Sequence, residues 1–139
     1  MTELEPPRRE EVGLGAALGI EYLEVGPELA RARMAVTEAV MQPFGIVHGG
    51  ALTALAESIT SLATYLSVKD QGMLAMGQAN DTSFLRPISA GHVTATARRR
   101  HGGRTTWVWD VELHDDDERL CALSRMTVAV RPNPAGDRA

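Results

Sequence analysis

The sequence predicts an α+β fold in which one long helix packs on a mainly antiparallel sheet. Residues 49–67 contain no proline and have the apolar periodicity of a helix, and no other segment of that length shows this pattern. Strand-like runs bounded by turn-forming residues lie on both sides of it. A chain of 139 residues suits a single domain. Strands, one long helix and further strands are typical of a sheet covered on one face by one helix.

Before the long helix we expect an arm, a short helix and a hairpin. Residues 1–10 are rich in charged residues and proline and are predicted to form a flexible arm. Residues 11–18 are predicted to form a short helix that Gly19 ends. Strands over 20–25 and 29–36 flank a glycine-proline turn, and apolar residues alternate with arginines in the second strand. These two strands are predicted to pair as a hairpin.

After the long helix the chain contains a series of strand-like segments. Turn-forming residues separate them, including a Gly-Gly pair and three consecutive aspartates. The segments span 74–84, 92–100, 105–114 and 119–130. Two prolines and a glycine then end the fold, so residues 11–131 are predicted to form the single domain and residues 132–139 a flexible tail.

The long helix has one apolar stripe and an unusual opposite side. The stripe, which is expected to pack on the sheet, contains Leu52, Leu55, Ile59, Leu62 and Leu66. The opposite side carries Thr53, Glu57, Ser61 and Thr64, without any lysine, arginine or aspartate. This composition suits a contact with a second subunit, which would place Glu57 in the seam between the two chains. It also fits an exposed face on which Glu57 only favours helix formation.

The start of this helix combines a histidine with two glycines. His48, Gly49 and Gly50 stand where the first backbone N–H groups have no partner within the helix. Those donors and the helix dipole can stabilise a negative charge such as the oxyanion of a thioester carbonyl, and a missing Cβ leaves room for an acyl group. The glycines alone favour a simple tight turn into the helix over such a site.

One longer segment contains both the helix start and Glu57. It reads Gln42-Pro43-Phe44-Gly45-Ile46-Val47-His48-Gly49-Gly50-Ala51, followed by Leu55-Ala56-Glu57-Ser58-Ile59 and Ser61. On these residues the chain resembles the hotdog-fold acyl-CoA thioesterases, in particular the group of 4-hydroxybenzoyl-CoA and phenylacetate-pathway thioesterases. The resemblance implies the hotdog fold over nearly the whole chain, although only this segment is diagnostic.

The resemblance also implies a reaction and roles for individual residues. The chain would hydrolyse an acyl-CoA to free acid and CoA, with the Gly49 amide polarising the thioester carbonyl and Gln42 and His48 shaping the same pocket. Glu57 would come from the neighbouring subunit and act either as nucleophile, forming an anhydride, or as general base for water. Ser61, one turn later, would orient the carboxylate or the water. The acyl group stays open between aryl and medium-chain groups, with the glutamate favouring aryl.

The coenzyme A part of such a substrate needs groups that bind phosphate. The candidates are Arg86, His101, Arg104 and Arg125, because guanidinium groups bind phosphates bidentately, and Gly50 is the candidate at the helix start. Each arginine also fits a solvated side chain or a structural ion pair. A site completed across subunits further implies a homo-oligomer, which is a dimer at least and in this family commonly a tetramer.

Composition excludes several other classes. A net charge of −4 argues against a nucleic-acid partner. The N-terminus lacks the apolar region of a signal peptide, no uninterrupted apolar run suits a membrane span, and the single cysteine fits a reducing compartment, so a cytoplasmic location is expected. The four histidines show no metal-ligand spacing, so we expect no metal and no cofactor, since coenzyme A belongs to the substrate.

Two other functions fit the same fold. A non-catalytic acyl-CoA-binding module is one, although no partner domain accompanies it here. A hydratase or dehydratase is the other, but the aspartate and histidine pair of a hydratase motif is not found. Because one scaffold hosts several chemistries, the thioesterase hypothesis rests on Gln42, His48, Gly49, Glu57 and Ser61 taken together.

Overall fold

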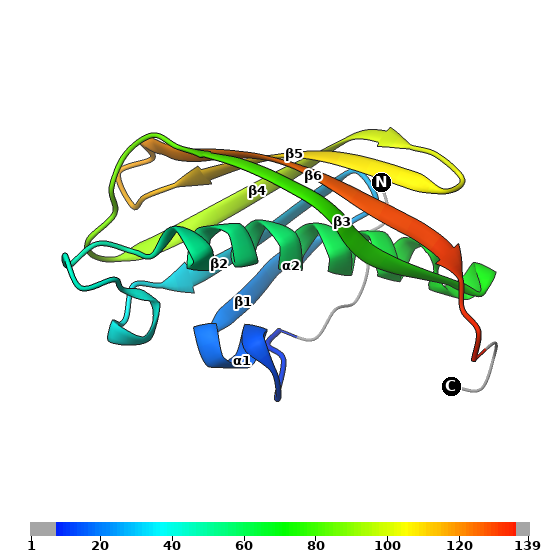
Figure 1. Cartoon of the computed structure of the whole chain (residues 1–139), viewed down its shortest axis with the longest axis horizontal. Helices are drawn as coiled ribbons and strands as arrows, with labels where there is room; N and C mark the ends of the chain where they lie inside the picture. The colour runs from blue at the N-terminus through cyan, green and yellow to red at the C-terminus, as the bar shows by residue number, and fades with distance from the viewer. Residues whose placement is uncertain (1–7, 136–139) are drawn as a thin grey trace.

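The computed structural model describes residues 8–135 and contains one long helix against a six-stranded sheet (Figure 1). The predicted α+β class is therefore confirmed. The outer parts of the predicted arm and tail, residues 1–7 and 136–139, lie outside the described residues. The predicted domain limits, 11–131, stay a prediction.

All neighbouring strands of the sheet pair antiparallel, in the order β1-β2-β4-β5-β6-β3. The strands begin and end close to the predicted positions. In chain order the elements are α1 (Leu14–Leu18), β1 (Ile20–Val25), β2 (Leu29–Ala35), the 3-10 helix η1 (Glu38–Val40), α2 (Gly49–Val68), the 3-10 helix η2 (Lys69–Gln71), β3 (Met73–Phe84), β4 (His92–Gly102), β5 (Thr106–His114) and β6 (Leu120–Pro132).

The first helix is shorter than predicted. It was expected over residues 11–18 but begins at Leu14. Gly13 has a φ of 87°, in the left-handed region, so the right-handed helix cannot extend back through it. Gly19, with a φ of 72°, ends the helix as predicted.

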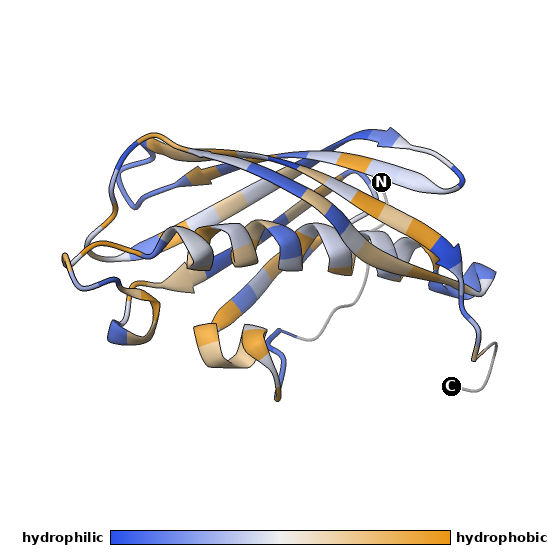
Figure 2. Cartoon of the chain, viewed as in Figure 1, coloured by the Kyte–Doolittle hydropathy of each residue, from blue (hydrophilic) through white to orange (hydrophobic). Residues whose placement is uncertain are grey.

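The sheet arches over α2, which runs across its inner face (Figure 1). Ala30, Ala32 and Met34 of β2 are fully buried, and the arginines between them lie on the other face, as the alternation predicts. On β5, Trp107 and Trp109 lie on the same buried face. Figure 2 shows hydrophilic residues at the tip of the hairpin between β4 and β5, away from this core. The core therefore lies between α2 and the inner face of the sheet.

The buried side of α2 is wider than the predicted apolar stripe. Three of the five stripe residues are buried, whereas Leu62 and Leu66 are only partly buried. The prediction that Thr64 faces away from the sheet is wrong, because its side chain is fully buried and its hydroxyl accepts a hydrogen bond from Trp109 Nε1 at 3.0 Å. A curved sheet covers more of a helix than a flat one does, and a hydroxyl with an indole partner is buried at little cost.

Within residues 8–135, strand β3 forms one edge of the sheet and pairs only with β6. Its residues from Met76 to Asp81 are exposed. The pairing runs from Gly77 opposite Val128 to Ala79 opposite Thr127, which leaves Gln78 as an extra residue in a bulge. An edge strand of this length presents unpaired backbone N–H and C=O groups, which are a template for pairing with another chain.

The helix α2 and the following η2 form an apolar segment, Gly49–Gln71. By length and mean hydropathy, 1.2, it could cross a membrane, but half of its apolar window is buried inside the fold. The segment packs on the sheet through this buried side. Its composition is therefore that of the core helix of the domain.

Candidate active site

The loop before α2 is a closed turn. Met41 and Val47 form an antiparallel bridge across it, and Gln42 lies inside it. The N–H of Gln42 donates to the carbonyl of Ile46 at 2.9 Å, and Gly45 turns the chain with a φ of 79° that favours glycine. The backbone of the partly exposed Gln42 is thus fixed directly before the start of the helix.

His48 caps the N-terminus of α2. Its Nδ1 accepts a hydrogen bond from the backbone N–H of Gly50 at 2.8 Å. A Cβ on Gly50 would lie 2.9 Å from that nitrogen, so the contact needs a glycine. The Gly50 N–H is therefore already paired with His48 and cannot bind a substrate. Gly50 can contribute only the space left by its missing side chain. The first free donor of the helix is the Gly49 amide, for which no acceptor is found among residues 8–135.

The ring of Phe84, at the end of β3, packs against Gly49. A Cβ on Gly49 would lie 3.0 Å from the Cζ atom of this ring, so a side chain at this position would displace it. The ring is 55% exposed, which leaves apolar surface beside the free amide. A carbonyl group that approached the Gly49 amide would therefore carry its substituent past an aromatic side chain.

Glu57 lies two turns further along α2, on the side that faces β3. Its side chain is exposed, and within the described part of the chain it has no hydrogen-bonding or charged partner. Together with Thr53, Ala54 and Asn80 it lines an open cleft of 340 Å³. The Asn80 side chain donates to the carbonyl of Thr53 at 3.0 Å and ties β3 to the helix at this point. The carboxylate is therefore available to a group from outside this chain.

Ser61 follows Glu57 by one helical turn. Its hydroxyl oxygen is buried and has no hydrogen-bond partner in the described chain. Buried hydroxyls in native proteins are nearly always paired, so this one calls for a partner that the single chain does not supply. A water held beside the Glu57 carboxylate has the right chemistry.

The five predicted catalytic residues fall into two groups. Gln42, His48 and Gly49 lie together at the N-terminal end of α2, and Glu57 and Ser61 lie together on the helix itself. Gly49 and Glu57 are separated by about 12 Å along the helix axis, at about 1.5 Å per residue. A glutamate side chain cannot cover that separation, so the two groups of one chain cannot act on one carbonyl.

The residues predicted to bind the CoA phosphates lie in different parts of the surface. Arg86 follows β3 and lies near the start of α2, two residues after Phe84. His101 and Arg104 lie at the turn between β4 and β5, where Arg104 borders a cleft with residues from the end of α2. Arg125 lies on β6. Within one chain these side chains form no common cluster.

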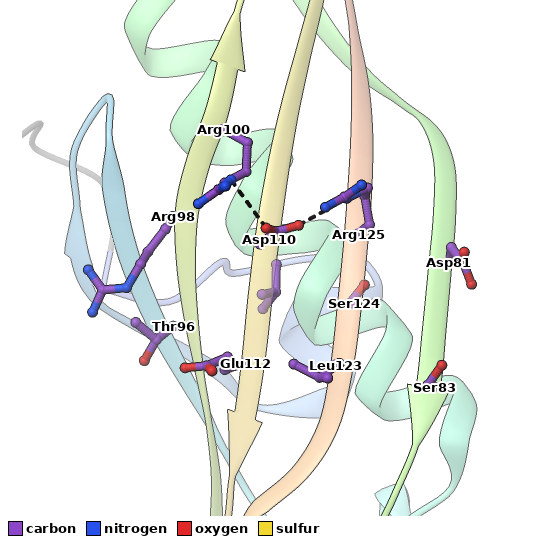
Figure 3. A pocket seen from close by; sticks show the side chains of 11 residues that line it. Asp81, Ser83, Thr96, Arg98, Arg100, Asp110, Glu112, Leu123, Ser124 and Arg125 are labelled. Carbon is purple, nitrogen blue, oxygen red and sulfur yellow. Dashed lines mark hydrogen bonds and ion pairs between the residues drawn. The ribbon is translucent and has the colours of Figure 1, made fainter.

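Arg125 borders a cleft of 510 Å³ that lies across strands β3 to β6 (Figure 3). Its guanidinium contacts the Asp110 carboxylate at 3.0 Å, and this hydrogen bond raises the pKa of Arg125 above its ordinary value. Asp110 also contacts Arg100 at 3.4 Å. Arg98 lines the same cleft, as the alternation of β4 predicts, and has no carboxylate partner among the described residues. Arg125 is thus partly neutralised before any phosphate arrives.

Sequence reasoning missed the residues of β3 that face the helix. Gly77 contacts Glu57, Asn80 contacts Thr53, and Phe84 contacts Gly49. These residues of β3 therefore lie along the side of α2 that carries the candidate catalytic residues. Strict alternation from Gly77 would place residues 79, 81 and 83 on this face. The bulge at Gln78 shifts the pattern by one residue, and no sequence feature marked that bulge.

The described chain offers no obvious centre for metal or thiol chemistry. Among residues 8–135, no three or more histidine, cysteine, aspartate or glutamate side chains are grouped so as to hold a metal ion. The single cysteine, Cys121, is buried in β6, and burial raises the pKa of its thiol. The expectation that the protein needs no metal or cofactor stays a prediction.

Comparison with known proteins identifies the family. The profile of the thioesterase superfamily matches residues 44–122, more than half of the chain. The chain belongs to the thioesterase superfamily. This thioesterase is 38% identical over 120 residues to the 1,4-dihydroxy-2-naphthoyl-CoA hydrolase of Listeria monocytogenes. The aligned region covers 86% of this chain and 97% of that protein.

Solved thioesterases have the same fold as this one. A thioesterase of Pseudomonas aeruginosa superposes with a TM-score of 0.81 and is 42% identical, over 85% of each chain. A protein of Staphylococcus aureus gives a TM-score of 0.81 at 33% identity, over 84% of this chain and 97% of the other. The hotdog fold and the thioester-hydrolase activity that the sequence resemblance implied are confirmed.

Proposed function

We propose that this thioesterase hydrolyses an acyl-CoA with an aryl or medium-chain acyl group to the free acid and CoA. The observation that carries the proposal is the free Gly49 amide at the N-terminus of a 20-residue helix, beside the exposed ring of Phe84. The amide and the helix dipole stabilise the oxyanion that forms at the thioester carbonyl. The Listeria relative, a hydrolase of an aromatic acyl-CoA by name, supports both CoA as the leaving group and the preference for an aryl acyl group.

Glu57 is the residue that we propose to carry the reaction. As a nucleophile, its carboxylate attacks the carbonyl carbon, the CoA thiolate leaves and takes up a proton, and water then cleaves the anhydride. As a general base, it takes the proton from a water that attacks the same carbon, and the C–S bond then breaks as the CoA thiolate leaves and takes up that proton. In either case Ser61 orients the carboxylate or the water, while Gln42 and His48 shape the pocket around the carbonyl.

Relatives with variants at two positions support the choice of Gln42 and Glu57. The Staphylococcus aureus protein has been solved with a glutamine replaced by alanine and, separately, with a glutamate replaced by alanine. In that protein the two residues have the same spacing as Gln42 and Glu57 have here. These were therefore residues of interest in a protein of the same fold.

A complete site needs two chains in this proposal. The distance of about 12 Å along α2 keeps Glu57 from the Gly49 amide of its own chain. The unpaired β3 edge, which lies beside Glu57, supports a homodimer at least, and the family resemblance extends this to a tetramer. Each site would then combine the Gly49 amide of one subunit with the Glu57 carboxylate of the other.

For the CoA end of the substrate, Arg86, His101, Arg104 and Arg125 stay the proposed phosphate ligands. Arg86 follows by two residues Phe84, whose ring packs against Gly49, so it lies on the side of the free amide. Arg125 must exchange or share its contact with Asp110. The other two lie at the far end of α2 and would serve a site only through assembly of subunits. A cytoplasmic location, where acyl-CoA substrates are available, is part of the same proposal.

Replacement of Glu57 tests the function. Release of free thiol from a panel of aryl-, phenylacetyl- and medium-chain acyl-CoAs gives kcat/KM for each substrate. Glu57→Ala and Glu57→Gln should lower kcat by about a thousandfold or more, because either role of the carboxylate is lost. Ser58→Ala, a change at the adjacent position on the same helix, should retain activity.

Three results decide between the hypotheses. Turnover that survives in both Glu57 variants contradicts the proposed mechanism. Calorimetry that shows acyl-CoA binding by the wild-type protein without thiol release would favour the non-catalytic binding module. Thiol release from the wild-type protein together with its loss in the Glu57 variants supports the proposal.

A further inference from the structure

The Glu57 carboxylate rests directly on the backbone of Gly77. A Cβ built on Gly77 would lie 3.1 Å from the carboxyl carbon, 3.2 Å from Cγ and 3.3 Å from Oε1 of Glu57. All three distances are shorter than ordinary van der Waals contacts of a Cβ with its neighbours. The end of the glutamate side chain therefore occupies the space that any other residue at position 77 would fill.

The backbone at Gly77 does not itself require a glycine. The left-handed φ values in the described chain belong to other residues, including the glycines at positions 13, 19, 45, 72 and 91. An alanine at position 77 can thus adopt the strand conformation without strain. What the glycine provides here is room between β3 and α2.

The gap between β3 and α2 is fixed on both sides of this contact. Toward the start of the helix, the Asn80 amide donates to the carbonyl of Thr53 at 3.0 Å. On the far side of β3, Gly77 pairs with Val128, a fully buried residue of β6. A methyl group on residue 77 is therefore accommodated more easily by the exposed and unpaired side chain of Glu57, which has to move by a few tenths of an ångström, than by a shift of the strand.

We propose that Gly77 is a positioning residue, whose missing side chain sets the place of the Glu57 carboxylate between α2 and the edge strand. The proposal rests on the proposed function, in which this carboxylate reaches the thioester carbonyl. It adds that the bulge at Gln78 serves the site, because the bulge lets both Gly77 and Asn80 face the helix. Gly77 touches no substrate in this account and acts only through Glu57.

The test compares Gly77→Ala in two backgrounds. In the wild type it should lower kcat by about 10-fold, because the contacts require the carboxylate to move by a few tenths of an ångström, less than the ~1 Å that costs about 100-fold. KM, the melting temperature and the oligomeric state should change little. In the Glu57→Ala background no side-chain atom is left near residue 77 for the added methyl group to displace, so Gly77→Ala should lower the residual kcat by at most about threefold, a non-additivity expected of residues in contact.

Ala79→Ser serves as the matched control. Asn80 faces the helix, so its neighbour Ala79 faces the opposite side of the same edge strand. This change should leave kcat as in the wild type. An equal loss of kcat from Gly77→Ala in both backgrounds, or a loss that follows a fall in melting temperature, would overturn the proposal.

A crystal structure of the Gly77→Ala variant supplies a readout that does not depend on activity. It should show the Glu57 carboxylate displaced from residue 77 with the backbone of β3 unchanged. A carboxylate in its wild-type place would refute the positioning role. If the wild-type protein hydrolyses none of the acyl-CoAs, the proposed function fails, and the position of this carboxylate still decides the role of Gly77.

Discussion

Gly49 combines two properties that can be separated by mutation. Its backbone N–H has no acceptor among residues 8–135, and its missing side chain leaves space that the Phe84 ring partly fills. Proline removes the N–H and adds a Cβ, whereas alanine only adds the Cβ. The preceding residue, His48, has φ and ψ of −66° and 132°, which a following proline permits, and proline is favoured at the first position of a helix.

We expect Gly49→Pro to be much less active than Gly49→Ala. Both variants push against the Phe84 ring, but only the proline removes the donor that faces the oxyanion. The ratio of their kcat values should be about 100 to 1,000, the range found when one oxyanion-hole donor is lost. Steady-state kinetics with one aryl-CoA measures this ratio, and circular dichroism checks that α2 still forms. Equal activity of the two variants would remove the Gly49 amide from the mechanism.

The contact between α2 and β5 shows how a polar pair stabilises the core. The Thr64 hydroxyl accepts from Trp109 Nε1 at 3.0 Å and donates to the carbonyl of Thr60 at 2.8 Å. Thr60 is equally buried, but its own hydroxyl donates only to carbonyls of its helix. Thr64 therefore has a partner on the sheet, and Thr60 has none.

Replacement of each threonine by valine keeps the size of the side chain and removes the hydroxyl. Thr64→Val leaves the buried indole N–H of Trp109 without an acceptor and should lower the free energy of unfolding by about 1–3 kcal/mol. Thr60→Val, the matched control, should change it by less than about 0.5 kcal/mol or stabilise the protein. Urea titration measures both values. Equal effects of the two changes would mean that the bond to Trp109 contributes nothing.

The predicted elements agree with the structure where a local signal decides them. Turn-forming residues fix the strand limits, and Gly19 ends the first helix as expected. The errors concern features that depend on tertiary packing. Thr64 was placed on the outer side because it lies opposite the leucine stripe of an ideal helix, but the curved sheet reaches this side of the helix and supplies an indole donor. The bulge at Gln78 likewise depends on how β3 pairs with β6.

The candidate site was predictable only in part for a related reason. The segment from Gln42 to Ser61 is contiguous in sequence, so its residues and their spacing could be read directly. The contacts of Gly77 and Phe84 with this segment join positions far apart in the chain, and no local pattern encodes them. The proposed phosphate ligands were chosen by residue type alone, which is why the structure spreads them over the surface.

At the scale of the whole molecule, the two halves of the site on one chain predict complementation between inactive subunits. Glu57→Ala removes the carboxylate and Gly49→Pro removes the amide, so each variant alone should be inactive. A mixed dimer retains one intact site, made from the Gly49 of one chain and the Glu57 of the other. Random co-assembly should therefore restore about one quarter of the wild-type activity, because half of the dimers are mixed and each has one site.

Co-expression of the two variants with different affinity tags allows the mixed dimer to be purified and assayed. Sedimentation checks the size of each species before the assay. If each chain contained a complete site, both chains of the mixed dimer would be defective and no activity would return. A fully active monomer would contradict the shared site directly.

The burial of both tryptophans also means that their fluorescence reports on folding rather than on the candidate active site. Trp107 and Trp109 lie with ring centroids 6.2 Å apart under α2, and the chain has no other tryptophan. Their emission therefore reports on the packing of the helix against the sheet. The free amide and the Glu57 carboxylate lie elsewhere on α2, with phenylalanine as the neighbouring aromatic ring. A variant can thus be monitored for folding by intrinsic fluorescence and, in a separate sample, for chemistry by thiol release.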